Sequence, residues 1–126
     1  MRRDLVKGDL PALVLAVLSK QPLHGYGIVR EVKLLSDNAL TMKEATLYPA
    51  LRVLEQDGLI VGEWQPQEKG ADRKVYTLTE KGAEEARRRT QELKDYVALI
   101  NKVLGRLDPG TLERKWAFFR PGVVSN

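Results

Sequence analysis

Hydrophobic residues in the first part of the chain recur with a helical period. Leucines and valines between residues 10 and 18 are spaced by three and by one, which predicts an amphipathic helix behind an N-cap at Asp9. The motif His24-Gly25-Tyr26-Gly27 is expected to open a second helix, and the polar residues 36–38 form the turn that ends it. The predicted buried side of this second helix consists of Ile28, Val32 and Leu35.

A third helix is predicted between about residues 42 and 57. Thr41-Met42-Lys43-Glu44 fits a capping box, in which a hydroxyl and a carboxylate three residues apart satisfy the first backbone amides. Gly58 stands where a left-handed C-terminal cap belongs. Pro49 removes one helical hydrogen bond, so we expect a bend in the first turns, a local irregularity typical of functional sites. The buried side should contain Leu47, Leu51 and Leu54.

The period then changes from helix to strand. Residues 59–64 and 73–78 are strand-like, and the polar residues 65–72 between them predict a hairpin with a charged tip. Thr79 then caps a long helix over residues 79–107, about 43 Å in length at 1.5 Å per residue.

Apolar and small residues recur along this long helix at spacings of three and four, as in a heptad seam. A small domain cannot bury such a stripe by itself, so a second copy of the chain is the simplest partner. The predicted dimerisation residues are Leu93, Val97, Ile100, Leu104 and Leu107.

Composition narrows the functions open to this chain. Its 126 residues can form one domain with an appendage, and 43% of them are hydrophobic. The absence of cysteine and the presence of a single histidine, His24, exclude thiolate chemistry and Cys- or His-based metal clusters. We therefore expect no enzymatic activity, no cofactor and no metal. No apolar run approaches the roughly 18 residues of a membrane helix, and no secretory signal is recognisable, which predicts a cytoplasmic protein.

The formal net charge of +4 is compatible with a polyanionic partner without identifying one. Residues 1–78 contain nearly equal numbers of basic and acidic side chains. Binding to nucleic acid would therefore depend on where individual charges lie, and not on the total charge.

Three short helices followed by a hairpin with a charged tip is the order of a winged helix-turn-helix. Its third helix enters the DNA major groove, and its wing contacts the backbone or the minor groove. The predicted fold class is α+β, with this domain over residues 1–78, the dimerisation helix over 79–107 and a tail over 108–126 that has room for a short helix. Some winged helices act as protein-interaction adaptors without DNA binding, and this alternative stays open.

Three segments together resemble the PadR family of transcriptional regulators, over roughly residues 10–105. They are Leu23-His24-Gly25-Tyr26-Gly27-Ile28, the run Thr46-Leu47-Tyr48-Pro49-Ala50-Leu51, and the junction Tyr76-Thr77-Leu78-Thr79-Glu80-Lys81-Gly82. One departure is Ala45, where many relatives have glycine. The resemblance implies the shorter subgroup with one C-terminal helix. It also implies a homodimeric repressor on an inverted-repeat operator of double-stranded DNA, released by a small aromatic or lipophilic effector.

Candidate DNA contacts fall on the third helix, at the start of the second helix and on the wing. Hydroxyl and cationic side chains there can bond phosphates or base edges. Structural alternatives remain for some of them, because Tyr48 and Tyr26 could pack as core aromatics and Arg52 could pair with Glu55 or Gln56. The predicted DNA-binding residues are Lys43, Thr46, Tyr48, Arg52, Tyr26, Lys69, Arg73 and Lys74.

Aromatic side chains in the second half of the chain are candidate effector contacts. They are Trp64, Tyr96, Trp116, Phe118 and Phe119. Tyr96, Leu99 and Val103 of the long helix would line a flat apolar pocket at the dimer interface, together with Trp116 of the tail. The alternative is a short tail helix over residues 111–119 that only closes the dimer core.

Overall fold

The computed structural model describes residues 3–5, 7–107 and 110, so nearly all of the predicted tail lies outside the described residues. The chain divides into two compact units, Met1–Leu93 and Lys94–Asn126, with the boundary inside the last helix. The elements in chain order are β1 (Arg3–Asp4), η1 (Lys7–Asp9), α1 (Leu10–Leu18), β2 (Leu23–His24), α2 (Gly25–Leu35), β3 (Leu40–Thr41), α3 (Glu44–Gln56), β4 (Ile60–Gln65), β5 (Arg73–Leu78) and α4 (Glu80–Gly105).

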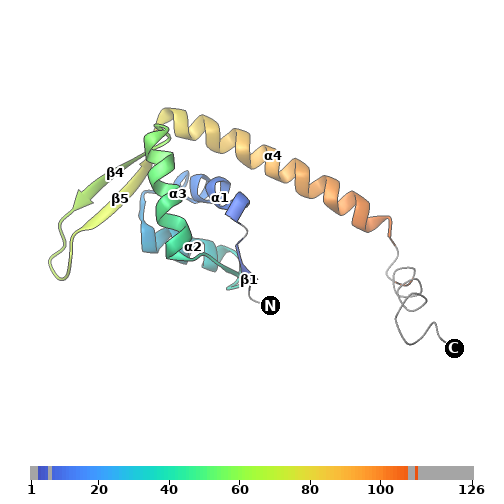
Figure 1. Cartoon of the computed structure of the whole chain (residues 1–126), viewed down its shortest axis with the longest axis horizontal. Helices are drawn as coiled ribbons and strands as arrows, with labels where there is room; N and C mark the ends of the chain where they lie inside the picture. Colours follow the sequence, from blue (N-terminus) through green and yellow to red (C-terminus); the bar gives the residue numbers. More distant parts are fainter. Residues whose placement is uncertain (1–2, 6, 108–109, 111–126) are drawn as a thin grey trace. The chain divides into compact units, whose positions relative to one another are not determined.

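The first unit is a winged helix. Helices α1, α2 and α3 pack against one another and against an antiparallel sheet with the strand order β2-β5-β4. Strands β4 and β5 form the predicted hairpin, whose tip at residues 66–72 lies away from α1 and α2 (Figure 1). The α+β winged-helix class is thereby confirmed. The two-residue strand β2, which pairs with β5, was not predicted because it is too short to show an alternating pattern.

The core forms where the helical periodicity predicts it, with one exception. Leu47, Leu51 and Leu54 of α3 are buried, and so are Ile28 and Val32 of α2. Leu35, however, is 55% exposed, which corrects the prediction that it is buried. It lies on the expected side of α2 but in the last turn, so a correct helical phase does not ensure that a neighbouring element covers the side chain.

The start of α3 differs from the predicted capping box. Thr41 belongs to β3, which pairs in parallel with β1, and Met42 is buried in the core. The backbone is still extended at Lys43, no side chain caps the helix, and α3 begins at Glu44. Strand pairing and burial of the preceding residues therefore override the capping signal. Asp9 occupies the N-cap position of α1 as predicted, but its side chain makes no capping hydrogen bond.

Close contacts join the end of α3 to the start of α4. Gly58 has a φ of 74°, and the amide of Leu59 donates to the carbonyl of Leu54 at 3.0 Å, as in a Schellman cap. Thr79 accepts a hydrogen bond from the Gly82 amide at 3.0 Å and donates its hydroxyl to the Gly58 carbonyl at 2.7 Å. A Cβ on Gly82 would overlap the carbonyl oxygen of Leu59, so this position requires glycine.

Helix α4 ends at Gly105, two residues before the predicted end. Ala86 in its first half is buried, whereas the large apolar side chains beyond Leu93 are 41–61% exposed. No helix in the described part of the chain is long and apolar enough to cross a membrane. The exposed apolar side chains of α4 and the residues just after it are Tyr96, Val97, Leu99, Ile100, Val103, Leu104 and Leu107.

Replacing Gly82 with alanine should destabilise the winged helix by about 1–3 kcal/mol or more, because the added methyl group would collide with backbone. Urea unfolding followed by circular dichroism, at fixed protein concentration, measures the change. Gly105→Ala is the matched control, since the methyl group there meets open space at the end of the same helix. An unchanged midpoint for Gly82→Ala would contradict the close contact with Leu59.

Candidate nucleic-acid interface

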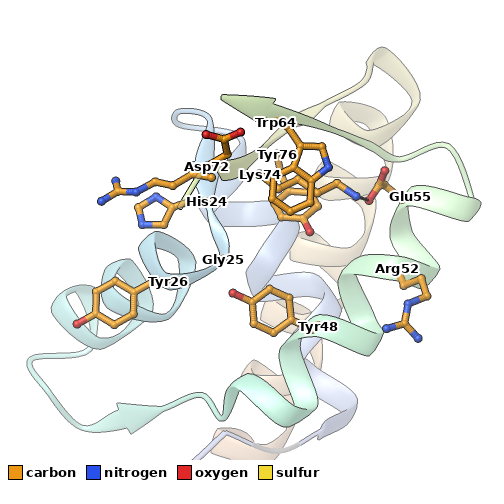
Figure 2. A pocket seen from close by; sticks show the side chains of 11 residues that line it. His24, Gly25, Tyr26, Tyr48, Arg52, Glu55, Trp64, Asp72, Lys74 and Tyr76 are labelled. Carbon is orange, nitrogen blue, oxygen red and sulfur yellow. Dashed lines mark ion pairs between the residues drawn. The ribbon is translucent and has the colours of Figure 1, made fainter. Parts of the chain in front are cut away.

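A groove of about 430 Å³ lies between the start of α2, one side of α3 and the hairpin β4–β5 (Figure 2). We refer to it as the α3–wing groove. Helix α3 contributes Tyr48, Arg52 and Glu55, which share one helical face because they are spaced by four and three residues. The hairpin contributes side chains from both strands, among them Trp64 and Tyr76.

Tyr48 lies against the first residue of α2. A Cβ on Gly25 would come within 2.5 Å of the Tyr48 hydroxyl oxygen, so the glycine permits this approach (Figure 2). Tyr48 remains 42% exposed, so it is neither a core aromatic nor fully solvated. The side chain of the N-cap residue His24 makes no capping hydrogen bond to α2. The positive N-terminal end of this helix is therefore available to an anion.

The cationic side chains around the groove differ in whether they form an ion pair. Arg52 and Arg73 are exposed and form no ion pair with any residue in the described ranges. The Lys74 ammonium instead lies 2.9 Å from a Glu55 carboxylate oxygen, an ion pair drawn in Figure 2. The hydrogen bond to Glu55 raises the pKa of Lys74. Within the described residues, Glu55 pairs with Lys74 and not with Arg52, which differs from the alternative pairing of Arg52 with Glu55.

The pKa of His24 is affected by the positive charges at the edge of the groove. Its ring stacks on the exposed ring of Tyr26, with centroids 6.3 Å apart, so Tyr26 is not a core aromatic. Burial lowers the pKa of His24, and the nearby charges of Arg73 and Arg30 lower it further. The same positive potential that disfavours the imidazolium favours an anion at this edge.

Three of the predicted DNA contacts do not line this groove. Thr46 lies on another side of α3, where it lines a separate groove with residues of α1. Lys43 is the N-cap residue of α3 and pairs with Asp4 at 3.2 Å, with both side chains exposed. Lys69 lies in the hairpin tip, where it is exposed and has no ion-pair partner within the described residues.

Trp64 lies in the α3–wing groove, where sequence reasoning did not expect it. It was considered as an effector contact, but it belongs to β4 and is 68% exposed. The role of Glu55 was missed as well, because its partner Lys74 comes from the second strand of the hairpin. Of the predicted effector contacts, Trp116 lies outside the described residues.

Comparison with known proteins decides the family. Residues 14–88, more than half of the chain, match the model of the "Transcriptional regulator PadR-like family". The chain belongs to this PadR-like family. The resemblance found in the sequence motifs is thereby confirmed, and so is a role as a transcriptional regulator. Regulators of this kind are generally not enzymes.

Solved structures extend the PadR-like likeness beyond the matched segment. A PadR-like transcriptional regulator from Bacillus cereus is 26% identical, with a TM-score of 0.65 over 78% of this chain and 93% of that chain. A protein from Streptococcus mutans is 32% identical, with a TM-score of 0.69 over 86% of this chain and 98% of that one. Among sequence relatives, the transcriptional regulator YqjI of Escherichia coli is 30% identical over 77 residues. These residues make up 61% of this chain and only 35% of YqjI.

The motifs that carry the PadR-like resemblance have visible physical roles. Gly25 of the first motif makes room for Tyr48 of the second, and this contact forms one wall of the α3–wing groove. Thr79 and Gly82 of the third motif bind the start of α4 to the end of α3. The first two motifs therefore lie in the candidate site, and the third lies at the contact between the end of α3 and the start of α4.

The pKa of His24, the only histidine of the chain, is lowered first by burial and then by the charges of Arg73 and Arg30. We expect its pKa to be lower in the folded than in the unfolded protein. Its contribution to stability is then present above the unfolded pKa of about 6.5 and is lost as pH falls through the lowered folded pKa. Proton NMR titration of the imidazole measures this pKa directly.

Two arginine variants separate the effect of local charge from that of burial. Arg73→Gln should raise the pKa of His24 toward its ordinary value, because one of the two named cations is removed. Arg87→Gln, which removes the same charge from an exposed position of α4, should leave it unchanged. A His24 pKa that stays the same in Arg73→Gln would contradict the positive edge.

Proposed function

We propose that this chain is a sequence-specific DNA-binding repressor that applies the α3–wing groove to double-stranded DNA as a homodimer. The observation that carries the proposal is that Arg52 and Arg73, beside the start of α2, are exposed and have no ion-pair partner among the residues that the structure describes. PadR-like regulators bind DNA, and in winged helices the third helix enters the major groove while the wing lies on the backbone or in the minor groove.

The exposed groups suit different parts of a duplex. The guanidinium of Arg52 can bond a guanine edge or a phosphate, and it lies one turn beyond Tyr48 on the same face of α3. The Tyr48 hydroxyl and the first amides of α2 suit one phosphate, with Tyr26 beside them. Arg73 and Lys69 of the wing suit further phosphates. Lys43 can also bind a phosphate by giving up its exposed ion pair with Asp4. Thr46 is assigned no contact because it faces the groove beside α1.

The proposed dimer forms through α4. Val97, Ile100, Leu104 and Leu107 are between 41% and 57% exposed in the single chain, and Leu93 is half-buried. Burying such side chains stabilises by about 1.5–3 kcal/mol each when burial is complete. A second copy related by a two-fold axis supplies this burial and presents two recognition helices, which an inverted-repeat operator requires.

We also propose an effector site on the second unit. Tyr96, Leu99 and Val103 are 58–61% exposed and widen the apolar face beyond the seam. A small aromatic or lipophilic molecule bound there would release the operator only if it favours a dimer geometry that cannot bind DNA. This part of the proposal rests on the family and on these exposed side chains.

Operator binding should be steeply salt-dependent. If a dimer neutralises about 6–10 phosphates, affinity for the fragment upstream of its own gene should fall about 10³–10⁵-fold between about 50 and 200 mM salt. Arg52→Gln should weaken binding by about tenfold, because a base-edge or charged phosphate bond is lost. Fluorescence anisotropy measures both effects. Arg87→Gln is the control for loss of one positive charge.

A flat salt response, or an Arg52→Gln variant that binds as tightly as the unaltered protein, would contradict the proposed interface. Such a result would favour the alternative function, a protein-interaction adaptor that has no DNA site.

Ile100→Glu should convert the dimer into monomers and abolish operator binding, because it places a charge in the apolar seam. Light scattering at micromolar concentration measures the mass in solution. Lys102→Glu adds an acidic side chain away from the seam and should leave the dimer intact. A folded monomer of the unaltered protein would refute the proposed dimer.

A further inference from the structure

Lys74 spans the space between the wing and α3. It belongs to β5, yet its ammonium lies 2.9 Å from the carboxylate of Glu55. Both side chains are only about 30% exposed, whereas those of the Lys43–Asp4 pair are 66% and 58% exposed. The ammonium also lies 5.6 Å from the centre of the Tyr76 ring, a distance at which the ring face attracts a cation.

Gly62 makes this path possible. It lies opposite Tyr76 in the hairpin, and a Cβ at this position would overlap Cε of Lys74 and come 3.1 Å from the Tyr76 ring. The aliphatic part of Lys74 therefore passes over the backbone of Gly62, where there is no side chain to block it. Gly62 does not have a positive φ, so the missing side chain, and not an unusual backbone conformation, explains a glycine inside a strand.

The outer half of the hairpin has little else to hold it. Between residues 63 and 73 every side chain is exposed except that of Gln67, which is half-buried. Within the described residues, the Lys74–Glu55 pair is the only ion pair or side-chain hydrogen bond between the hairpin and α3. The base of the hairpin is held by strand pairing and by the buried Ile60 and Tyr76, whereas its outer half has this pair as its polar link to α3 in the described chain.

We propose that the Lys74–Glu55 pair is a brace that fixes the wing relative to α3, and that Lys74 is a positioning residue and not a phosphate contact. The inference rests on the proposed DNA-binding function and assigns Glu55 and Gly62 a part in it. A braced wing loses less conformational freedom when DNA binds, so it binds more tightly.

The brace and a phosphate contact predict opposite effects for Glu55. If Lys74 bonded a phosphate, neutralising Glu55 would free its ammonium and remove a carboxylate from the interface, so DNA would bind more tightly. If the pair is a brace, the same substitution releases the wing, and DNA binds more weakly. The sign of the change therefore distinguishes the two roles.

The test uses full-length protein and anisotropy titrations with operator DNA at several salt concentrations. Glu55→Gln should weaken binding about fivefold, a change typical of the loss of one contact between neighbouring residues. Glu63→Gln is the matched control, because it neutralises an exposed carboxylate of β4 that forms no ion pair in the described chain. It should leave binding unchanged or make it slightly tighter.

Exchanging the two charges, Glu55→Lys with Lys74→Glu, should restore most of the affinity lost in Glu55→Gln, because the ion pair can form again. Lys74→Met should weaken binding without changing its salt dependence. The brace would be overturned by tighter binding of Glu55→Gln. It would also be overturned if Lys74→Met lowered the slope of affinity against salt by about one unit for each lysine removed.

Wing mobility is measured without DNA, so the brace and the proposed function can fail separately. Trp64 lies opposite Lys74 in the hairpin, and Trp116→Phe leaves it as the single indole. Time-resolved fluorescence anisotropy of Trp64 should show greater local motion in Glu55→Gln and in Gly62→Ala, but not in Glu63→Gln. Equal motion in all variants would overturn the brace. Absence of DNA binding by every variant, with these differences in motion, would overturn the proposed function alone.

Discussion

The contact of Gly82 with the Leu59 carbonyl fixes the start of α4 on the end of α3. Only a residue without a Cβ allows this approach, and Thr79 adds three hydrogen bonds around it, one of them from its amide to the same Leu59 carbonyl at 3.1 Å. Lys81 contributes a fourth bond, from its ammonium to the Asp57 carbonyl at 2.9 Å. Backbone contact and hydrogen bonds therefore join the end of α3 to the first turn of α4.

Local signals were sufficient to predict most of the fold. The positions of Leu47, Leu51 and Leu54 follow from a period of 3.6 residues, and Gly58 and Thr79 mark helix ends with their own backbone and side-chain bonds. The errors arose where distant segments meet. Pairing of β3 with β1 shifted the start of α3. No local pattern indicates that Leu35, the last residue of α2, is left exposed by the neighbouring elements.

The candidate site was predictable only in part, for the same reason. Tyr48 and Arg52 share a face of α3 that the helical period alone defines. The partner of Lys74 depends on the register of the hairpin and on the missing side chain of Gly62, neither of which is visible in local sequence. Thr46 lies beside α1, in a groove apart from the α3–wing groove, and the sequence does not reveal this placement.

Mapping the DNA-binding surface in solution tests the central claim most directly. Backbone amide signals of isotope-labelled protein can be followed by NMR during titration with operator duplex at low salt. We expect the amide signals of Gly25, Tyr26, Tyr48, Arg52 and Arg73 to change most, because these residues line the α3–wing groove. Changes confined to the apolar face of α4, with the signals of α3 and the wing unaltered, would contradict this claim.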